Sequence, residues 1–174
     1  MANKVFISTI AVLVALIFPR IGAFSQDEIS GRAIAISGDT LRLKNEEDKS
    51  EIEVRLWGID APETNQHCET RTGRSIDCGI LAKNVLKATI RRKTLTCVDF
   101  DKDEEGTVTA LCYLGDKILN SMVVRSGWAM AYKRESSNYL GIEKVARLAE
   151  KGIWQYRFDT VSYTHLTLPT NREV

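Results

Sequence analysis

The sequence predicts an α+β domain, a five-stranded Greek-key β-barrel accompanied by about three helices. Two groups of short segments with alternating apolar residues, within residues 29–58 and 94–114, are typical of strands. A segment with helical spacing separates the groups, and no internal repeat or linker divides the chain of 174 residues. Strands in two groups with a helix between them fit such a barrel, and the length suits one domain.

Five segments are expected to be strands, and they cover residues 29–36, 41–44, 51–58, 94–100 and 108–114. The turn at Gly38 separates the first two segments, and the polar turn 45–50 separates the second from the third. The first three strands therefore form a meander, and the last two return to the sheet after the helical segment.

Three further segments are expected to be helices. Residues 78–92 have helical spacing, residues 117–125 end before the stop signal at Gly127, and a last amphipathic helix closes at Gly152. The apolar stripes are formed by Leu81, Val85 and Thr89 in the first helix and by Ile142, Val145 and Ala149 in the last. Together with the strands, these helices fit a small barrel of the oligonucleotide/oligosaccharide-binding (OB) type.

The two ends of the chain differ from this domain. Lys4 followed by the apolar run 5–18 is typical of a secretory signal peptide, which we place at residues 1–25. An uncleaved anchor is the weaker alternative, because a membrane span needs roughly 20 apolar residues. The folded domain is then 26–159, and 160–174 is predicted to be a disordered tail that could be non-native. The protein is expected to be secreted or periplasmic, without stable membrane insertion after cleavage.

The cysteines fit an exported protein. Their number is even, and three pairings are possible; the favoured one joins Cys68 to Cys78 and Cys97 to Cys112. A zinc site is the competing interpretation, but the spacing lacks Cys-x-x-Cys and the chain contains only two histidines.

The segment 54–64 carries the most functional information. Period-two alternation places Arg55 on the face of its strand opposite to the apolar residues. The strand then ends in a turn that carries Asp60 and Glu63, and Asp39 lies in an earlier turn of sequence Gly-Asp-Thr. Side chains on turns at strand ends are well placed for a site that a rigid sheet supports.

Three carboxylates beside one guanidinium suit the cleavage of a phosphodiester. A hard divalent cation binds carboxylate oxygens, and a guanidinium donates two hydrogen bonds to a phosphate. The plainer alternative is that Asp39 and Asp60 cap turns, while Arg55 pairs with Glu53 or Asp60 at the surface. For each residue taken alone, that alternative is the more common one.

Together these residues resemble the staphylococcal nuclease (thermonuclease-like) family. The shared motifs are the Gly-Asp-Thr turn, the segment Arg55-Leu-Trp-Gly-Ile-Asp-Ala-Pro-Glu63, and the segments 110–113, 120–129, 131–132 and 152–154. The resemblance covers about residues 29–158, and it implies an OB-fold nuclease acting on DNA or RNA.

The resemblance also implies roles for single residues. Asp39 and Asp60 would hold a calcium ion with help from the backbone carbonyl that follows Asp60. Glu63 would be the general base that activates water, and Arg55 would bind the phosphate. Tyr132 falls where the family commonly places a tyrosine near the bound nucleotide, which implies a substrate contact.

One position departs from the family pattern. The second catalytic arginine of the family belongs where this chain has Thr107, and the preceding segment 101–105 is acidic. An arginine that stabilises a phosphoryl transition state contributes about 10³ to 10⁵ in rate. A cation elsewhere could take its place, and the candidates are Arg71, Arg74, Lys102 and Lys133.

Two functions follow from the sequence. The first is an exported, calcium-dependent nuclease in which Thr107 replaces one catalytic arginine, expected to be a monomer. The alternative is a binding module of nuclease fold, for nucleic acid or another ligand, with impaired chemistry. The formal net charge of +1 weakens the case for tight, salt-sensitive binding of DNA. Retention of Arg55 and Glu63 favours the enzyme.

Overall fold

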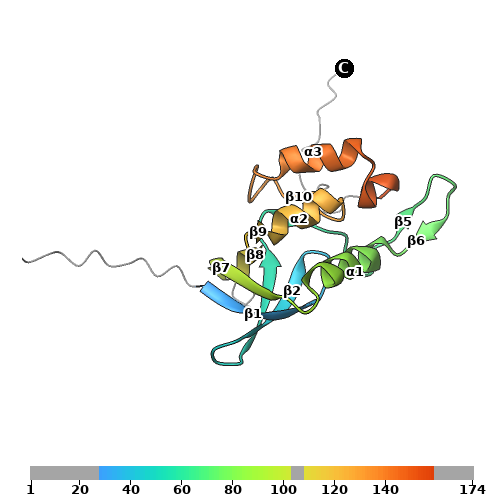
Figure 1. Cartoon of the computed structure of the whole chain (residues 1–174). Coiled ribbons are helices and arrows are strands. Elements are labelled where there is room, and N and C mark those ends of the chain that lie inside the picture. Colours follow the sequence, from blue (N-terminus) through green and yellow to red (C-terminus); the bar gives the residue numbers. More distant parts are fainter. Residues whose placement is uncertain (1–27, 103–107, 159–174) are drawn as a thin grey trace, which may run out of the picture.

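The computed structural model describes residues 28–102 and 108–158 (Figure 1). The strands are β1 (Glu28–Ala35), β2 (Thr40–Asn45), β3 (Glu51–Leu56), β4 (Ile59–Asp60), β5 (Cys68–Glu69), β6 (Ser75–Ile76), β7 (Thr94–Lys102), β8 (Val108–Leu114), β9 (Lys117–Ile118) and β10 (Met130–Ala131). The helices are α1 (Cys78–Ile90), α2 (Leu119–Ser126), α3 (Leu140–Leu148) and the 3-10 helix η1 (Gly152–Gln155).

The main sheet closes into a barrel. Its strand order is β3-β2-β1-β7-β8-β9, with antiparallel neighbours throughout. A parallel pairing of β3 with β8, in which Val54 faces Val108 and Leu56 faces Ala110, joins the first and fifth of these strands. The predicted α+β domain with a five-stranded OB-type barrel is therefore confirmed.

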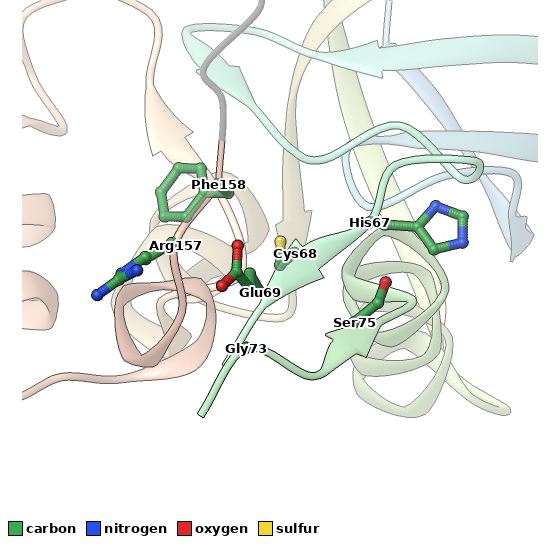
Figure 2. Close-up of a pocket in the computed structure, with 7 residues that line it drawn as sticks. All are labelled: His67, Cys68, Glu69, Gly73, Ser75, Arg157 and Phe158. Atoms are coloured by element: carbon green, nitrogen blue, oxygen red, sulfur yellow. The ribbon is translucent and has the colours of Figure 1, made fainter. Parts of the chain in front are cut away.

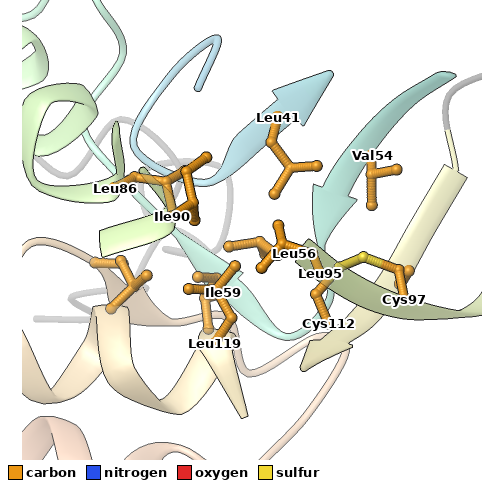
Figure 3. Close-up of a cluster of buried hydrophobic side chains, with 14 of the residues drawn as sticks. Leu41, Val54, Leu56, Ile59, Leu86, Ile90, Leu95, Cys97, Cys112 and Leu119 are labelled. Carbon is orange, nitrogen blue, oxygen red and sulfur yellow. A yellow bond between two sulfur atoms is a disulfide. The ribbon is translucent and has the colours of Figure 1, made fainter. Parts of the chain in front are cut away.

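The barrel interior holds the hydrophobic core (Figure 3). Fully buried side chains come from the strands and from the helices that cover the barrel, and they include Leu41, Leu43, Val54, Leu56, Leu95, Leu86 and Leu119. Burial of each such side chain contributes about 1.5–3 kcal/mol of transfer free energy. Because Val54 and Leu56 point inward, Arg55 between them points out of the barrel.

The predicted helix at 78–92 exists, but its buried face is offset by one residue. Ala82, Leu86 and Ile90 are buried, whereas the predicted stripe contains Leu81, which is 38% exposed. Apolar side chains occupy both adjacent rows of α1, so spacing alone could not identify the row that packs on β1 and its neighbours. The prediction of Leu81, Val85 and Thr89 as the core stripe was therefore wrong.

The last helix shows a similar difference. Val145 is 62% exposed, while Glu143 and Ala146 are buried. The buried carboxylate of Glu143 accepts a hydrogen bond of 2.8 Å from the backbone N–H of Ala131, beside β10. The buried face of α3 is therefore rotated from the predicted stripe, and it contains a polar side chain as an anchor.

Element boundaries also move. Helix α1 ends at Ile90, and Arg92 adopts a left-handed conformation with φ of 59°. Residues 117–118, predicted to begin a helix, form the short strand β9 instead, and α2 begins at Leu119. Its predicted end is confirmed, because Gly127 has φ of 81° and terminates the helix.

Both favoured disulfides are present. Cys97 and Cys112 are cross-strand partners in β7 and β8, with an S–S distance of 2.03 Å. Cys68 in β5 bonds Cys78 at the start of α1, which ties the projecting β5–β6 hairpin to the barrel (Figure 1). The cysteines are consequently not zinc ligands.

Several predictions fall on residues 1–27, 103–107 and 159–174, which lie outside the described part of the chain. They concern the signal peptide, the C-terminal tail and the place of Thr107. Of the helices that are described, none has both the length and the apolar character required to cross a bilayer.

Candidate active site

The first acidic residue of the site, Asp39, lies in the turn between β1 and β2. Its carboxylate accepts hydrogen bonds from the hydroxyls of Ser37 and Thr40, at 2.6 and 3.0 Å, and from the backbone N–H of Ala61, at 3.0 Å. A side chain at Gly38 would place its Cβ 2.7 Å from the Ala61 Cβ, so only glycine allows the turn to come this close. Asp39 is thereby fixed against the segment that follows β4.

Asp60 is held by a second, two-stranded sheet. It is the last residue of β4 and pairs with Met130 of β10. Gly58, just before β4, has φ of 75°, and a Cβ there would lie 2.7 Å from the ring of Tyr139. A glycine is therefore required for the chain to leave β3 and enter β4 at this angle.

Glu63 lies where the next turn presses against α1. Its backbone carbonyl accepts a hydrogen bond of 2.8 Å from the N–H of Gln66. A Cβ at Gly79, in the first turn of α1, would lie only 1.6 Å from this carbonyl oxygen. The helix therefore fixes the backbone of Glu63, while its side chain remains exposed.

The charge environment of Glu63 connects it to the other two carboxylates. Partial burial raises the pKa of Glu63 above the ordinary value of a glutamic acid, and the negative charges of Asp39 and Asp60 raise this pKa further. Such repulsion requires the three carboxyls to share one region. We refer to Asp39, Asp60 and Glu63 as the carboxylate cluster.

Arg55 stands on the outer face of β3, between Thr40 of β2 and Thr109 of β8. Its Nη2 atom forms an ion pair with Glu135 and lies 3.5 Å from the hydroxyl oxygen of Thr109. Glu53, one of the two surface partners considered from the sequence, pairs with Arg42 at 3.6 Å. Glu135 was missed because it lies 80 residues from Arg55 and belongs to no recognisable motif.

Tyr132 directly follows β10 and lies beside the turn that joins β3 to β4. Its backbone N–H donates a hydrogen bond of 2.9 Å to the carbonyl of Gly58. The side chain is half-buried. The structure thus brings Tyr132 close to the chain that links Arg55 to Asp60.

The carboxylate cluster has the chemistry of a site for a hard cation. A carboxylate has about four acceptor positions, and the hydrogen bonds to Asp39 described above use three of them. Within the described ranges, no three acidic, histidine or cysteine side chains form a ready-made metal cage. Two carboxylates completed by water fit a weakly held divalent ion, and a cation would relieve the repulsion that raises the pKa of Glu63.

Four residues were considered as substitutes for the missing second catalytic arginine, and their environments differ. Arg71 pairs with Glu150 at 2.6 Å, so its charge is already compensated. Arg74, Lys102 and Lys133 are exposed.

A separate cavity of about 330 Å³ lies beside the β5–β6 hairpin (Figure 2). Its lining consists of His67, Cys68, Glu69, Gly73, Ser75, Arg157 and Phe158. Neither the carboxylate cluster nor Arg55 contributes to it. We call this cavity the hairpin pocket. His67, at its edge, has its Nε2 3.0 Å from Asp77 and its Nδ1 3.0 Å from the carbonyl of Asn65.

Comparison with known proteins identifies one matching family model and several similar proteins. The family model described as "Staphylococcal nuclease homologue" matches residues 53–156. A protein of Haemophilus influenzae named "Uncharacterized endonuclease" is 33% identical over 142 residues, which cover 80% of this chain and 74% of that protein. An Escherichia coli protein of the same name is 27% identical over 131 residues, or 73% of this chain and 78% of that protein. The "Succinoglycan biosynthesis protein ExoI" of Rhizobium meliloti is 30% identical over 150 residues, or 83% and 74%.

Proposed function

The chain belongs to the staphylococcal nuclease homologue family, and from this premise we propose that it is an exported nuclease that hydrolyses phosphodiester bonds of DNA or RNA. The observation that carries the proposal is the placement of the carboxyls: Asp39 accepts a hydrogen bond from the N–H of Ala61, which follows Asp60, and the charges of both aspartates raise the pKa of Glu63. Like charges that lie close together repel one another and lower the stability of the fold. Such a cluster is therefore better explained by a functional role than by a structural one.

Glu63 acts as the general base in this proposal. Its side chain is partly exposed to solvent, and its backbone is fixed by the contact with Gly79. A base is most effective when its pKa lies close to the operating pH, and the upward direction of the shift moves Glu63 toward that condition. Glu63 thus accepts a proton from the attacking water.

Arg55 binds the phosphate that is cleaved. It projects from the outer face of β3, and the β3–β8 pairing sets its position. A guanidinium donates two parallel hydrogen bonds to a phosphate, which both orients the phosphorus and offsets its negative charge. Tyr132 contributes a contact to the nucleotide.

Asp39 and Asp60 would hold a calcium ion, with the carbonyl of Ala61 as a further oxygen donor. A bound divalent cation supplies Lewis acidity at the phosphoryl oxygen and lowers the pKa of water. The hydrogen bonds from Ser37, Thr40 and Ala61 orient the Asp39 carboxylate.

Export is proposed from the disulfides together with the N-terminal sequence. Disulfides persist in oxidising compartments and are rare in the cytosol. The pairs Cys68–Cys78 and Cys97–Cys112 therefore support a secreted or periplasmic protein.

A second candidate function is a nuclease-fold module that binds nucleic acid without efficient cleavage. Thr107 in place of an arginine favours it, and so does the pairing of Arg55 with Glu135, which reduces the positive charge offered to a phosphate. This candidate predicts binding without turnover.

The test is the hydrolysis of single-stranded DNA and RNA by the mature protein, in calcium and in EDTA. Glu63→Gln should lower the rate by about 10² to 10⁴, because it removes the general base. Glu47→Gln, the same change in the exposed turn between β2 and β3, is the matched control and should cleave normally. An inactive parent that gains cleavage with Thr107→Arg would instead establish the binding module.

A further inference from the structure

The ion pair between Arg55 and Glu135 lies within the proposed phosphate site. The contact is made by Nη2 of Arg55 and one carboxylate oxygen of Glu135. The Glu135 side chain is only 19% exposed and that of Arg55 is 34% exposed, so the pair is shielded from water more than an ordinary surface ion pair. A guanidinium has five N–H donors, and Nη2 carries two of them.

Glu135 does not depend on Arg55 for its position. Its second carboxylate oxygen accepts a hydrogen bond of 2.7 Å from the backbone N–H of Gly58. Its own backbone N–H, with that of Ser136, bonds to the carbonyl of Tyr132 at 3.1 Å. The carboxylate therefore stays beside the guanidinium when a phosphate approaches.

The surrounding charge is negative on balance. Glu135 pairs with Arg55, and Asp39 lies in the turn just before Thr40, the partner of Arg55 in β2, so acidic groups of the site adjoin this guanidinium. Glu135 acts on any phosphate at Arg55 in two ways: it withdraws part of the donor capacity of Nη2, and it repels the phosphate charge.

We propose that Glu135 is a specificity-determining residue that makes the Arg55 site prefer a singly charged internal phosphodiester over a doubly charged terminal phosphomonoester. The proposal rests on the proposed function in one respect, that Arg55 binds the substrate phosphate. By Coulomb's law, the repulsion between Glu135 and the phosphate doubles when the phosphate charge doubles. Discrimination by an unfavourable contact against the wrong ligand is a common source of specificity.

Coulomb's law also gives the size of the change in affinity that the Glu135 charge causes. One unit charge a few ångströms from a partly exposed phosphate changes the affinity for a monoanion by about three- to tenfold. The same charge changes the affinity for a dianion by the square of that factor, about ten- to hundredfold. The square relation is the specific signature of the proposal, because a loss of packing would change both affinities alike.

The test compares thymidine 5′-phosphate with its methyl ester, two probes that differ by one negative charge and one methyl group on the phosphate. Their dissociation constants are measured by calorimetry at pH 8 and fixed calcium, for the mature parent and for Glu135→Gln. We expect Glu135→Gln to bind the methyl ester about three- to tenfold more tightly and the monoester more tightly by the square of the factor observed. Equal gains for both probes, no gain, or weaker binding would overturn the proposal.

Two controls separate this effect from others. The first control is Glu53→Gln, which also removes one negative charge and lies on the same face of β3 as Arg55. Because Glu53 pairs with Arg42, this variant should leave both affinities nearly unchanged. In an Arg55→Gln background, Glu135→Gln should lose its effect on the difference between the probes. Thermal unfolding of each variant verifies that it is folded.

The binding preference can be measured whether or not the protein cleaves DNA, so the two proposals can fail separately. If the parent cleaves DNA while Glu135→Gln leaves the preference unchanged, the proposed function stands and this inference fails. If the preference shifts in a protein that never cleaves, the inference stands and the enzymatic function fails. Failure of every folded variant to bind either probe overturns the inference, because Arg55 is then no phosphate site.

Discussion

The carboxylate cluster and the hairpin pocket both adjoin the start of α1, through Glu63 beside Gly79 and through the Cys68–Cys78 disulfide, but their charged groups are arranged differently. In the cluster, like charges lie close together, so that partial burial and then the charges of Asp39 and Asp60 raise the pKa of Glu63. Around the hairpin, complementary groups pair: the His67 ring lies 3.0 Å from Asp77, and Arg71 forms an ion pair with Glu150 at 2.6 Å. Like charges held close together by a fixed backbone favour a role in chemistry, whereas an exposed ion pair is typical of a solvated surface.

The largest effect expected from this contrast concerns metal binding and activity. Asp60→Asn should lower cleavage by about 10² or more and should abolish any rise in melting temperature caused by calcium, because a metal ligand is removed. Asp77→Asn makes the same chemical change beside the hairpin pocket. It should retain both cleavage and the response to calcium in scanning calorimetry. Equal losses in the two variants would remove the distinction between the regions.

A second effect concerns the backbone that fixes the cluster. Gly79→Ala places a methyl group 1.6 Å from the present position of the Glu63 carbonyl oxygen and should destabilise the protein by about 3 kcal/mol. Gly141→Ala is the matched control, since a Cβ there meets nothing within 4 Å and alanine favours a helix. Urea unfolding measures both. If Gly79→Ala is as stable as Gly141→Ala, the turn is not fixed by α1.

A smaller effect concerns the way in which Glu63 makes the stability of the fold depend on pH. The pKa of Glu63 is raised in the folded protein, so the folded state holds this proton more tightly than the unfolded state, and stability falls as pH rises through the interval between the two pKa values. Glu63→Gln should therefore be slightly more stable than the parent at neutral pH and equal to it in acid. Calcium should reduce the difference. Thermal melts across pH values provide the measurement, and a variant less stable at neutral pH would contradict the repulsion.

The smallest effect belongs to the hairpin. The Arg71–Glu150 pair has side chains that are 72% and 58% exposed. Such a pair contributes little, so Arg71→Gln should change the free energy of unfolding by less than about 0.5 kcal/mol and leave cleavage unchanged. A large loss of activity would mean that Arg71 acts as the replacement cation near the substrate.

Much of this arrangement could be predicted from the sequence, for a physical reason. Arg55, Asp60 and Glu63 lie on one short segment, and the pairing of β2 with β3 brings the turn of Asp39 to its side. Alternation along β3 decided which face Arg55 occupies. The five strands of the barrel and the favoured disulfide pairs were predicted from equally local patterns, whereas the short strands β4, β5, β6, β9 and β10 were not predicted.

Other features depended on contacts between distant segments. Glu135 reaches Arg55 through the return of β10 beside β4, which no periodicity indicates. The buried rows of α1 and α3 were misassigned because apolar side chains occupy more than one row, and a buried glutamate, Glu143, occupies one of them. Only tertiary packing selects between such rows.

The role of the carboxylate cluster is tested most directly by a titration of the Glu63 side-chain carboxyl by carbon-13 NMR, without and with calcium. We expect that the pKa of Glu63 lies above the ordinary glutamate value in the absence of metal and falls when calcium binds between Asp39 and Asp60. An ordinary pKa that calcium leaves unchanged would contradict this role, because the three carboxylates would then neither converge nor hold a cation.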